Sequence, residues 1–433
     1  MDTVEILYDT YLRSRKVTTD SRGVEPGCIF FALKGERFDG GAFVEQALAG
    51  GAALCVTSWR EYEGRERCLV VPDVAEALRT LAVRHRASLG ISVLGITGTN
   101  GKTTTKELVR AVLSRRYRTS ATRGNLNNHL GVPLTLLSIP ADAEVAIVEM
   151  GANHPGEIAD LCRVASPGFG LITNVGRAHL EGFGSFEGVV ATKTELYRHL
   201  AHGGTAFVCA DNSLLVDEAA KCAPGMTVVT YGSSTASQVR GSHVADVPFM
   251  RFYFEVADCV YTVQSRLLGG YNFQNCMAAV CVGLRFGVDP FDIKEAIEAY
   301  EPSNQRSQLK ATGRNRLYLD CYNANPSSME AAVASFAAQE WPRKAAVIGG
   351  MHELGADERA EHMRLVDMLA GCGLERCLLV GPEFDGLALP AGMTRCADTA
   401  EAAAVLRREP IEGALVLVKG SNTNRLWTLE ELL

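Results

Sequence analysis

The sequence lacks the long apolar run that a membrane-spanning helix would need. Such a helix takes about 20 consecutive apolar residues, and no stretch of this 433-residue chain approaches that length. The first residues, MDTVEILYDTYL, are acidic and do not show the basic-then-apolar order of a secretory signal. We therefore expect a cytoplasmic protein that does not bind a membrane.

Closely spaced cysteine pairs are also missing. The 13 cysteines are scattered, their number is odd, and no Cys-x-x-Cys pair occurs. This pattern argues against a disulfide framework or a zinc site and favours reduced thiols, most of them small core residues.

An excess of basic residues is absent as well. The net charge is -7, so the composition does not indicate binding to nucleic acid. With 47% hydrophobic and 21% charged residues, the chain has the composition of a globular protein, and its length predicts about two to four domains. No internal repeat or low-complexity segment is visible.

Apolar strands and helical segments alternate along most of the chain, which predicts an α/β fold with three domains. We expect a small α/β domain at residues 1–88, a central parallel-sheet domain at 89–302 and a C-terminal Rossmann-like, doubly wound domain at 303–433. Residues 238–268 show strand alternation more typical of an antiparallel meander. Residues 85–90 are expected to form an exposed joint.

The segment VLGITGTNGKTTTKEL, residues 93–108, joins an apolar strand to a glycine-rich turn and a helix. A helix N-terminus preceded by glycines is an anion site, where Lys102 would reach the outer phosphates and Thr103 would bind Mg²⁺. The spacing departs from the usual GxxxxGK[ST], because Ile96 stands where the first glycine belongs. A glycine-rich turn with a solvated lysine is the simpler alternative. The nucleotide-binding residues that this segment predicts are Gly98, Thr99, Asn100, Gly101, Lys102, Thr103 and Thr104.

TGTNGKTT is the form that this loop takes in the Mur ligase family, and the chain resembles that family along essentially its whole length. The loop, the AHLE segment and DCYNANP follow one another in the order of that family. The resemblance implies a central ATP-binding domain and an ATP-dependent amide ligase, which first makes an acyl phosphate from a carboxylate and then lets an amine attack it.

The resemblance also implies a metal site and a modified lysine. Glu149, which ends an apolar strand, and His179 of AHLE would bind Mg²⁺ together with Thr103. From the residues alone, His179 could equally be a proton carrier or a loop histidine, since imidazole is an unusual Mg²⁺ ligand. Lys193 of ATKTEL would carry a carbamate made from CO₂, although the sequence alone favours an exposed helix lysine.

Three further residues are assigned to ATP by resemblance. Asn272 and Asn275, at the start of a helix, match positions near the adenine, but asparagines there are often only helix caps. Arg306 matches an interdomain arginine that contacts the phosphates, and its alternative is a surface arginine in a linker. The implied catalytic residues are Lys102, His179, Lys193 and Arg306.

The segment LYLDCYNANPSSM resembles one branch of the family, the ligases that add D-alanyl-D-alanine to a UDP-N-acetylmuramoyl tripeptide in peptidoglycan precursor synthesis. Asp320 ends a strand and suits ribose hydroxyls, and Asn323 is likewise assigned to the nucleotide. GGMHELG, His362 and LVKGSN also resemble this branch, but Asn422 stands where arginine is usual.

The first domain resembles the family's uridine-nucleotide-binding domain. Ser21 and Arg22, in TTDSRGV, are candidates for binding the UDP-sugar. The alternative is that the segment DSR, residues 20–22, forms only a capped turn. Gly41 stands where histidine is common.

Several alternatives stay open. The sister ligase that adds the third residue usually carries a DNPR-type motif, which is not found in the third domain, and folylpolyglutamate synthase lacks this N-terminal domain. A P-loop kinase or a nucleotide-driven binding module would belong to a different class. A monomer is the default expectation.

Overall fold

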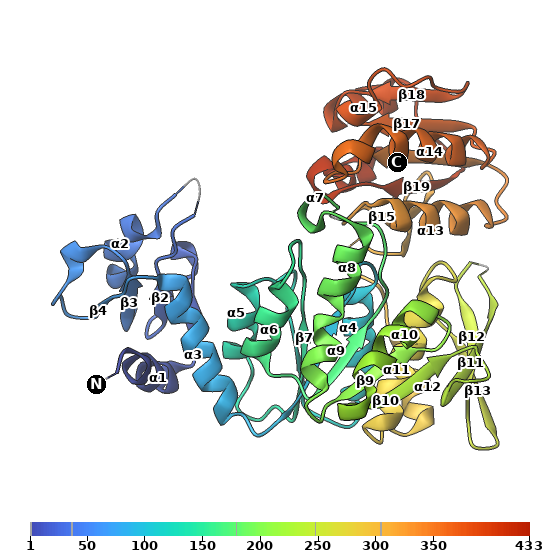
Figure 1. Cartoon of the computed structure of the whole chain (residues 1–433). Coiled ribbons are helices and arrows are strands. Elements are labelled where there is room, and N and C mark those ends of the chain that lie inside the picture. The colour runs from blue at the N-terminus through green and yellow to red at the C-terminus, as the bar shows by residue number, and fades with distance from the viewer. Residues whose placement is uncertain (1, 36–37, 179, 247, 304) are drawn as a thin grey trace.

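The computed structural model describes residues 2–35, 38–178, 180–246, 248–303 and 305–433. Within these ranges the strands form three sheets, and each sheet lies inside one of the three expected segments (Figure 1). The α/β class with three domains is confirmed, whereas the exact domain boundaries stay a prediction.

The N-terminal segment forms a four-stranded sheet in the order β1-β2-β3-β4, and all its strand pairs are parallel. Parallel strands need covered faces, and helices pack against this sheet. Its elements are α1 (Thr3–Ser14), β1 (Val17–Thr18), β2 (Ile29–Phe31), α2 (Val44–Ala49), β3 (Leu54–Thr57), β4 (Cys68–Val70) and α3 (Val74–Ser88).

The central segment forms a nine-stranded sheet in the order β13-β12-β11-β10-β9-β8-β5-β7-β6. Strands β5 to β10 pair in parallel, and the apolar run at β5 is buried between two hydrophobic cores, as expected for a strand covered on both faces. Its first elements are β5 (Ser92–Thr97), α4 (Lys102–Leu113), β6 (Thr119–Ala121), α5 (Gly131–Leu137), β7 (Val145–Glu149), α6 (Glu157–Ala165), β8 (Phe169–Ile172), α7 (Leu180–Phe183), α8 (Phe186–Lys193), α9 (Glu195–Leu200) and β9 (Thr205–Cys209).

The antiparallel meander expected at residues 238–268 is confirmed, and it extends the central sheet. Strand β11 pairs in parallel with β10 and in antiparallel fashion with β12, which pairs with β13. The remaining elements of this segment are α10 (Ser213–Cys222), β10 (Thr227–Gly232), β11 (Val239–Ala245), β12 (Arg251–Val256), β13 (Cys259–Gln264), α11 (Asn272–Arg285) and α12 (Pro290–Ala299).

The C-terminal segment forms a six-stranded sheet in the order β14-β15-β19-β16-β17-β18, in which only the edge strand β14 is antiparallel. Separate hydrophobic cores cover its two faces, which is the doubly wound arrangement. Its elements are β14 (Gln308–Ala311), β15 (Arg316–Asp320), α13 (Pro326–Ala337), β16 (Lys344–Gly349), α14 (Glu358–Ala370), β17 (Arg376–Val380), β18 (Met393–Cys396), α15 (Thr399–Arg408) and β19 (Leu415–Lys419).

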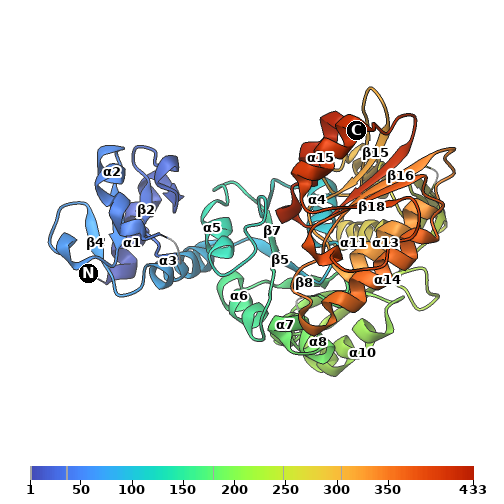
Figure 2. The ribbon, with the colours of Figure 1, turned by 90° about the horizontal axis from the view of Figure 1, so that it is seen from above.

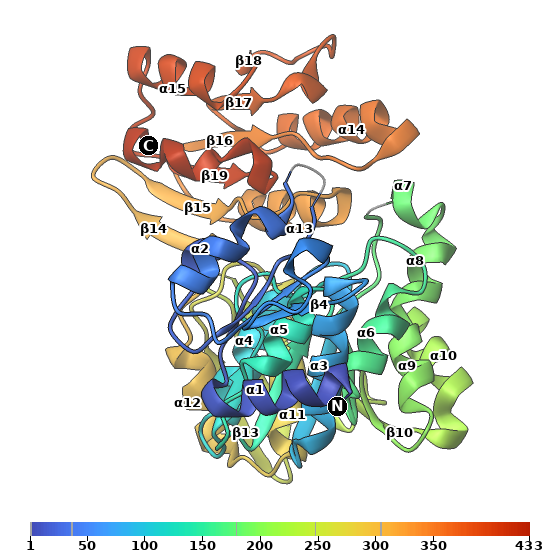
Figure 3. The same cartoon turned by 90° about the vertical axis from the view of Figure 1, so that its left-hand side faces the viewer.

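Each domain contacts the domain that follows it along the chain. The N-terminal domain packs through α3 against α5 and α6, away from the C-terminal domain (Figures 1 and 2). In Figure 3 the C-terminal domain lies above the central one, and α13 is its nearest helix. The contact between the first two domains corrects one expectation, because His85 is buried beside Tyr11 inside α3 rather than in an exposed joint.

Other composition-based expectations can be checked directly. Nine of the 13 free cysteines are buried, so the expectation that most are core residues is confirmed. No helix in the described part of the chain is long and apolar enough to cross a membrane.

Candidate active site

A pocket of about 700 Å³ lies between the central and C-terminal domains. The loops at the carboxyl ends of β5, β7 and β8 face those after β15 and β19 across it, as parallel α/β sheets commonly place their ligands. Of the described residues predicted to bind nucleotide or metal or to act in catalysis, all lie on its wall: Gly98, Thr99, Asn100, Gly101, Lys102, Thr103, Thr104, Glu149, Lys193, Asn272, Asn275, Arg306, Asp320 and Asn323.

The loop between β5 and α4 owes its shape to two glycines with positive φ, +141° at Gly98 and +77° at Gly101. A Cβ atom at Gly98 would lie 2.0 Å from the Thr173 hydroxyl oxygen, so a larger residue does not fit there. Gly95 belongs to β5 and packs against Met150 instead. The odd spacing therefore reflects where the turn begins, at Gly98 rather than at position 96.

Lys102 folds back over this loop. Its Nζ donates to the carbonyl oxygens of Gly98 at 2.8 Å and Thr99 at 3.0 Å. Burial lowers the pKa of Lys102 to about 8, with Glu149 opposing the shift and Arg306 adding to it. A cation held over a turn of backbone N–H groups makes this loop an anion site.

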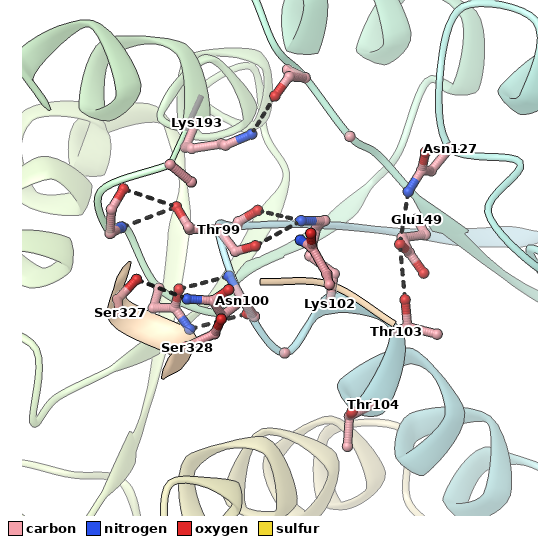
Figure 4. Close-up of a pocket in the computed structure, with 18 of the residues that line it drawn as sticks. Thr99, Asn100, Lys102, Thr103, Thr104, Asn127, Glu149, Lys193, Ser327 and Ser328 are labelled. Atoms are coloured by element: carbon pink, nitrogen blue, oxygen red, sulfur yellow. Dashed lines mark hydrogen bonds between the residues drawn. The ribbon is translucent and has the colours of Figure 1, made fainter. Parts of the chain in front are cut away.

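Glu149 ends β7 in a cluster of oxygen and amide groups (Figure 4). Its Oε1 accepts from the Thr103 hydroxyl at 3.1 Å and from Asn127 Nδ2 at 2.9 Å. Its buried Oε2 has no hydrogen-bond partner among the described residues, and the nearest cation, Lys106 Nζ, is 3.8 Å away. A carboxylate with one open oxygen beside a hydroxyl fits a hard cation such as Mg²⁺. The third predicted ligand, His179, lies outside the described residues.

Lys193, the last residue of α8, is not an exposed helix lysine. Its side chain is 2% exposed, its Nζ donates to the Ala152 carbonyl at 3.2 Å, and it lies 5.4 Å from the centroid of the Phe183 ring. Burial and, to a smaller extent, the nearby charge of Lys102 together lower the pKa of Lys193 to about 7, with Glu157 and Glu195 opposing the shift. A substantial fraction of this amine is therefore neutral at neutral pH, which is the form that can react with CO₂.

The C-terminal domain touches the glycine-rich loop directly. The Asn100 and Asn325 side-chain amides pair reciprocally, with Asn325 Nδ2 donating to Asn100 Oδ1 at 2.8 Å and Asn100 Nδ2 donating to Asn325 Oδ1 at 3.4 Å. Asn100 Nδ2 also donates to the Ser327 hydroxyl at 3.0 Å (Figure 4). Asn325 is the N-cap of α13, so one residue begins a helix and contacts the loop of the other domain.

The amides of Asn272 and Asn275 are engaged by protein groups. Asn275 donates to Asn272 at 2.8 Å and accepts from the Thr105 hydroxyl at 3.0 Å, while Asn272 donates to the Leu268 carbonyl at 2.8 Å. A Cβ atom at Gly101 would lie 2.6 Å from Asn275 Oδ1, so Asn275 supports the loop from behind. Contact of either asparagine with an adenine stays a prediction.

Arg306 lies in the pocket with its guanidinium 3.9 Å from the centroid of the Tyr322 ring. Its buried Nε has no hydrogen-bond partner among the described residues. A stacked arginine with an open donor is suited to bind an anion, so the structure does not favour the alternative of a surface arginine.

Asp320 ends β15 and forms a buried ion pair. Lys419, at the end of the neighbouring β19, donates from Nζ to Asp320 Oδ2 at 2.7 Å and to the Asn323 carbonyl at 3.1 Å. The Lys419 side chain is 1% exposed and that of Asp320 is 17% exposed. Lys419 therefore fixes the turn that carries two of the three predicted nucleotide residues of this domain, Asp320 and Asn323.

Ser21 and Arg22 lie in the N-terminal domain and do not line this pocket. Arg22 is exposed, and its Nε and Nη2 donate to the two carboxylate oxygens of Asp20. These hydrogen bonds lower the pKa of Asp20 to about 2. At Gly41 a Cβ atom would lie 2.3 Å from the Trp59 indole, so the indole fills the space a larger residue would need.

Comparison with known proteins agrees with this architecture. Three family models match in order: "Mur ligase family, catalytic domain" at residues 14–86, "Mur ligase middle domain" at 96–283 and "Mur ligase, glutamate ligase domain" at 305–422. A Bacillus subtilis (strain 168) protein named UDP-N-acetylmuramoyl-tripeptide–D-alanyl-D-alanine ligase is 36% identical over 84% of this chain and 79% of its own. The chain belongs to the Mur ligase family.

Solved Mur ligases share the complete fold. A crystal structure of MurF from Acinetobacter baumannii superposes with a TM-score of 0.86 at 32% identity, covering 96% of this chain and 93% of the other. MurF ligase from Thermotoga maritima, solved in complex with ADP, gives 0.85 at 27% identity, covering 100% and 98%. Similarity across all three domains confirms the family resemblance noted in the sequence.

Some residues of this Mur ligase site were not found from the sequence. Lys106 is buried, donates to the Thr122 carbonyl at 2.6 Å and supplies the cation nearest to Glu149. Its position one helical turn after Lys102, and so on the same face of the helix, could have indicated from the sequence that Lys106 lies near the site. Asn127, Asn325 and Ser327 gave none, because asparagine and serine at turns usually serve only as local caps.

We predict that Lys419→Met destabilises the C-terminal domain by about 3–5 kcal/mol, because it leaves the Asp320 carboxylate buried without its partner. Chemical unfolding of the variant would measure this loss. Lys310→Met in the same domain is the control: its side chain is 50% exposed and pairs with Glu430, so the loss should stay below about 1 kcal/mol. Equal losses in the two variants would contradict the role assigned to Lys419.

Proposed function

We propose that this Mur ligase joins D-alanyl-D-alanine to a UDP-N-acetylmuramoyl tripeptide, using ATP, in the synthesis of a peptidoglycan precursor. The observation that carries the proposal is the single pocket in which the glycine-rich loop and Lys193 of one domain face Arg306 and Asp320 of the next. The substrate assignment rests on the B. subtilis relative, whose name specifies this tripeptide and this dipeptide.

The residues of the pocket suit ATP bound to Mg²⁺. Lys102 and Arg306 would supply positive charge for the phosphates, and the Asp320 carboxylate, which lines the same pocket, would accept from the ribose hydroxyls. Thr103 and Glu149 would hold the Mg²⁺, together with the predicted ligand His179. When bound, the metal would neutralise charge on the phosphate oxygens. The ADP in the T. maritima relative supports a nucleotide in this family's site.

In the proposed reaction the tripeptide carboxylate attacks the γ-phosphate of ATP, and ADP leaves. The dipeptide amine then attacks the resulting acyl phosphate, and inorganic phosphate leaves as the amide forms. Little covalent chemistry falls to the protein in such a transfer, so its side chains position the reactants and balance charge. Lys102 and Arg306 balance the charge of the phosphates, while closure of the two domains excludes water from the acyl phosphate.

Lys193 is proposed to carry a carbamate. Its nearly complete burial and its lowered pKa keep the amine neutral often enough to react with CO₂. The change would replace a buried cation by an anion, which would help to hold Mg²⁺ in the pocket. Because the uncombined amine is protonated below pH 7, we infer that the carbamate is lost as the pH falls below that value.

The remaining assignments complete the proposal. The N-terminal domain, residues 1–88, would bind the UDP part of the substrate with Ser21 and Arg22, and the domains at 89–302 and 303–433 would share the ATP. We propose that the protein acts in the cytoplasm as a monomer and that its product serves cell-wall growth, cell shape and cell division.

Phosphate release from ATP tests the proposed function. We predict that release requires both the UDP-muramoyl tripeptide and D-alanyl-D-alanine, because the acyl phosphate needs the carboxylate and its turnover needs the amine. Single free amino acids are the control amines. Release with a UDP-dipeptide and a free diamino acid would instead indicate the sister ligase, a phosphorylated end product would indicate a kinase, and no release with any pair would contradict a ligase.

We predict that Lys193→Ala loses ligase activity and regains part of it with acetate or another short carboxylate, which would replace the anion of the carbamate. Turnover measured against carboxylate concentration would show this rescue. Lys221→Ala removes a 66% exposed helix lysine and should respond to no carboxylate. A folded Lys193→Ala enzyme that no carboxylate restores would count against the carbamate.

A further inference from the structure

Arg306 lies between two residues with an uncommon backbone conformation. Gln305 has φ of +58° and Ser307 has φ of +46°, in the left-handed region that residues other than glycine rarely adopt. Such a conformation is unfavourable and persists only where the surrounding structure enforces it. The direction in which the Arg306 side chain leaves the backbone is therefore set by the contacts of its two neighbours.

Each of these neighbours is tied to a different domain. The Gln305 carbonyl accepts from the Cys321 N–H at 3.0 Å, directly after β15 in the C-terminal domain. The Ser307 hydroxyl is held by the start of α11 in the central domain: its oxygen lies 2.8 Å from the Tyr271 hydroxyl oxygen and accepts from Asn272 Nδ2 at 3.3 Å. Ser307 is 4% exposed, so its hydroxyl depends on these protein partners. The arginine between the two residues is thus fixed by one domain on each side.

The hydroxyl groups around Ser307 form a chain of hydrogen bonds with one direction. Tyr318 donates from its hydroxyl to Ser335 Oγ at 3.3 Å, so its oxygen accepts in the 3.0 Å contact with the Tyr271 hydroxyl. Because Tyr271 uses its only proton there, the Ser307 hydroxyl is the donor in its contact with Tyr271. Tyr271, Ser307 and Tyr318 therefore each donate one hydrogen bond within this chain and accept one.

This chain crosses the junction between the central and C-terminal domains where the packing is tight. Tyr271 is the N-cap of α11, whereas Tyr318 belongs to β15 and Ser335 to α13. A Cβ atom at Gly269, which has φ of +83°, would lie 2.3 Å from Tyr271 Cε1 and 2.8 Å from Ser335 Oγ. Glycine at position 269 thus allows the tyrosine ring and the helix of the other domain to come together.

The chain also reaches the helix that follows the glycine-rich loop. Asn272, which donates to Ser307, accepts from Asn275 at 2.8 Å, and Asn275 accepts from the Thr105 hydroxyl at 3.0 Å. Thr105 lies on α4, in the turn of helix that begins at Lys102. Direct contacts therefore connect Ser307 to the element that forms the anion site.

The side chain that these contacts orient faces the same part of the pocket as Lys102. The guanidinium of Arg306 lies over the Tyr322 ring, its Nε has no hydrogen-bond partner among the described residues, and its charge contributes to the lowered pKa of Lys102. Tyr271 and Ser307 line this pocket as well. A shift of the backbone at position 307 would therefore move a cation within the nucleotide pocket.

We propose that Tyr271 and Ser307 are positioning residues for Arg306, and that they hold its guanidinium toward the phosphates of ATP; this rests on the proposed function. The Tyr271 hydroxyl fixes the Ser307 side chain, and this contact keeps the backbone of Ser307 at positive φ. Without the contact, Ser307 relaxes to the ordinary negative φ and the side chain of Arg306 turns away from the phosphates.

The test is a double-mutant cycle on the affinity for ATP, measured by equilibrium binding with Mg²⁺ and without the peptide substrates, so that no turnover occurs. Tyr271→Phe keeps the packed ring and removes only the hydroxyl. We expect it to weaken ATP binding about tenfold in the wild-type background. In the Arg306→Ala background the same change should weaken binding less than about twofold, because the residue that it positions is gone.

Tyr117→Phe is the matched control. Its hydroxyl donates to the Phe286 carbonyl at 2.7 Å, and Tyr117 is not among the described residues that line the pocket, so ATP affinity should stay at the wild-type value. An equal loss with and without Arg306, or an unchanged affinity of folded Tyr271→Phe, would overturn the proposal, because direct contact with ATP or a role in folding alone would then explain Tyr271.

If Tyr271→Phe does not fold, Ser307→Ala removes the same contact from the other side and takes its place in the cycle. Equal losses for Ser307→Ala in the two backgrounds would overturn the proposal as well. A wild-type protein that binds no ATP would contradict the proposed function itself, whereas ATP binding by the wild type with equal losses in the cycle overturns only the role of Tyr271 and Ser307.

Discussion

The amide pair between Asn100 and Asn325 is the contact on which the nucleotide pocket depends. Asn100 lies in the tight turn between β5 and α4, and Asn325 begins α13 in another domain. Ser327 adds a second contact to Asn100, and it also lies against Gly176, where a Cβ atom would be 2.8 Å from its hydroxyl oxygen. The loop that would hold phosphate is thus shaped partly by the neighbouring domain.

Buried charge is the second constraint on this site. Three lysines lie near Glu149 or the glycine-rich loop: Lys102, Lys106 and Lys193. Burying a charged lysine costs free energy unless ion pairs or hydrogen bonds compensate for the lost water. Burial lowers the pKa values of Lys102 and Lys193, so the region tolerates these amines partly by letting them lose protons. The neutral form of Lys193 is the one that can react with CO₂, whereas Lys102 balances the charge of the phosphates only in its protonated form.

Much of the fold could be predicted from the sequence, because apolar strands, helices and the turn at Gly98 leave local patterns. The α/β class, the meander at residues 238–268 and the membership in the Mur ligase family are confirmed. Local patterns cannot reveal contacts between segments far apart in the chain. For that reason His85 was expected in an exposed joint, and the amide pair with Asn325 was not foreseen.

The sequence-based prediction of the site is limited for the same reason, because local patterns do not reveal contacts between distant segments. Lys193 looked like a surface residue because its helix alone does not show that Ala152 and Phe183 cover it. The roles of all the predicted site residues stay predictions. The pocket does not include Ser21 and Arg22, and His179 lies outside the described residues.

The most direct test of a nucleotide site shared by two domains is a double-mutant cycle on ADP affinity. The affinity is measured for Asn100→Ala, Asn325→Ala and the double variant by equilibrium binding. Because the two amides touch, we predict a coupling energy of at least about 0.5 kcal/mol. The double variant should therefore lose less ADP binding free energy than the two single variants lose together. Strictly additive losses, or no effect of Asn325→Ala, would contradict a nucleotide site that depends on the contact between Asn100 and Asn325.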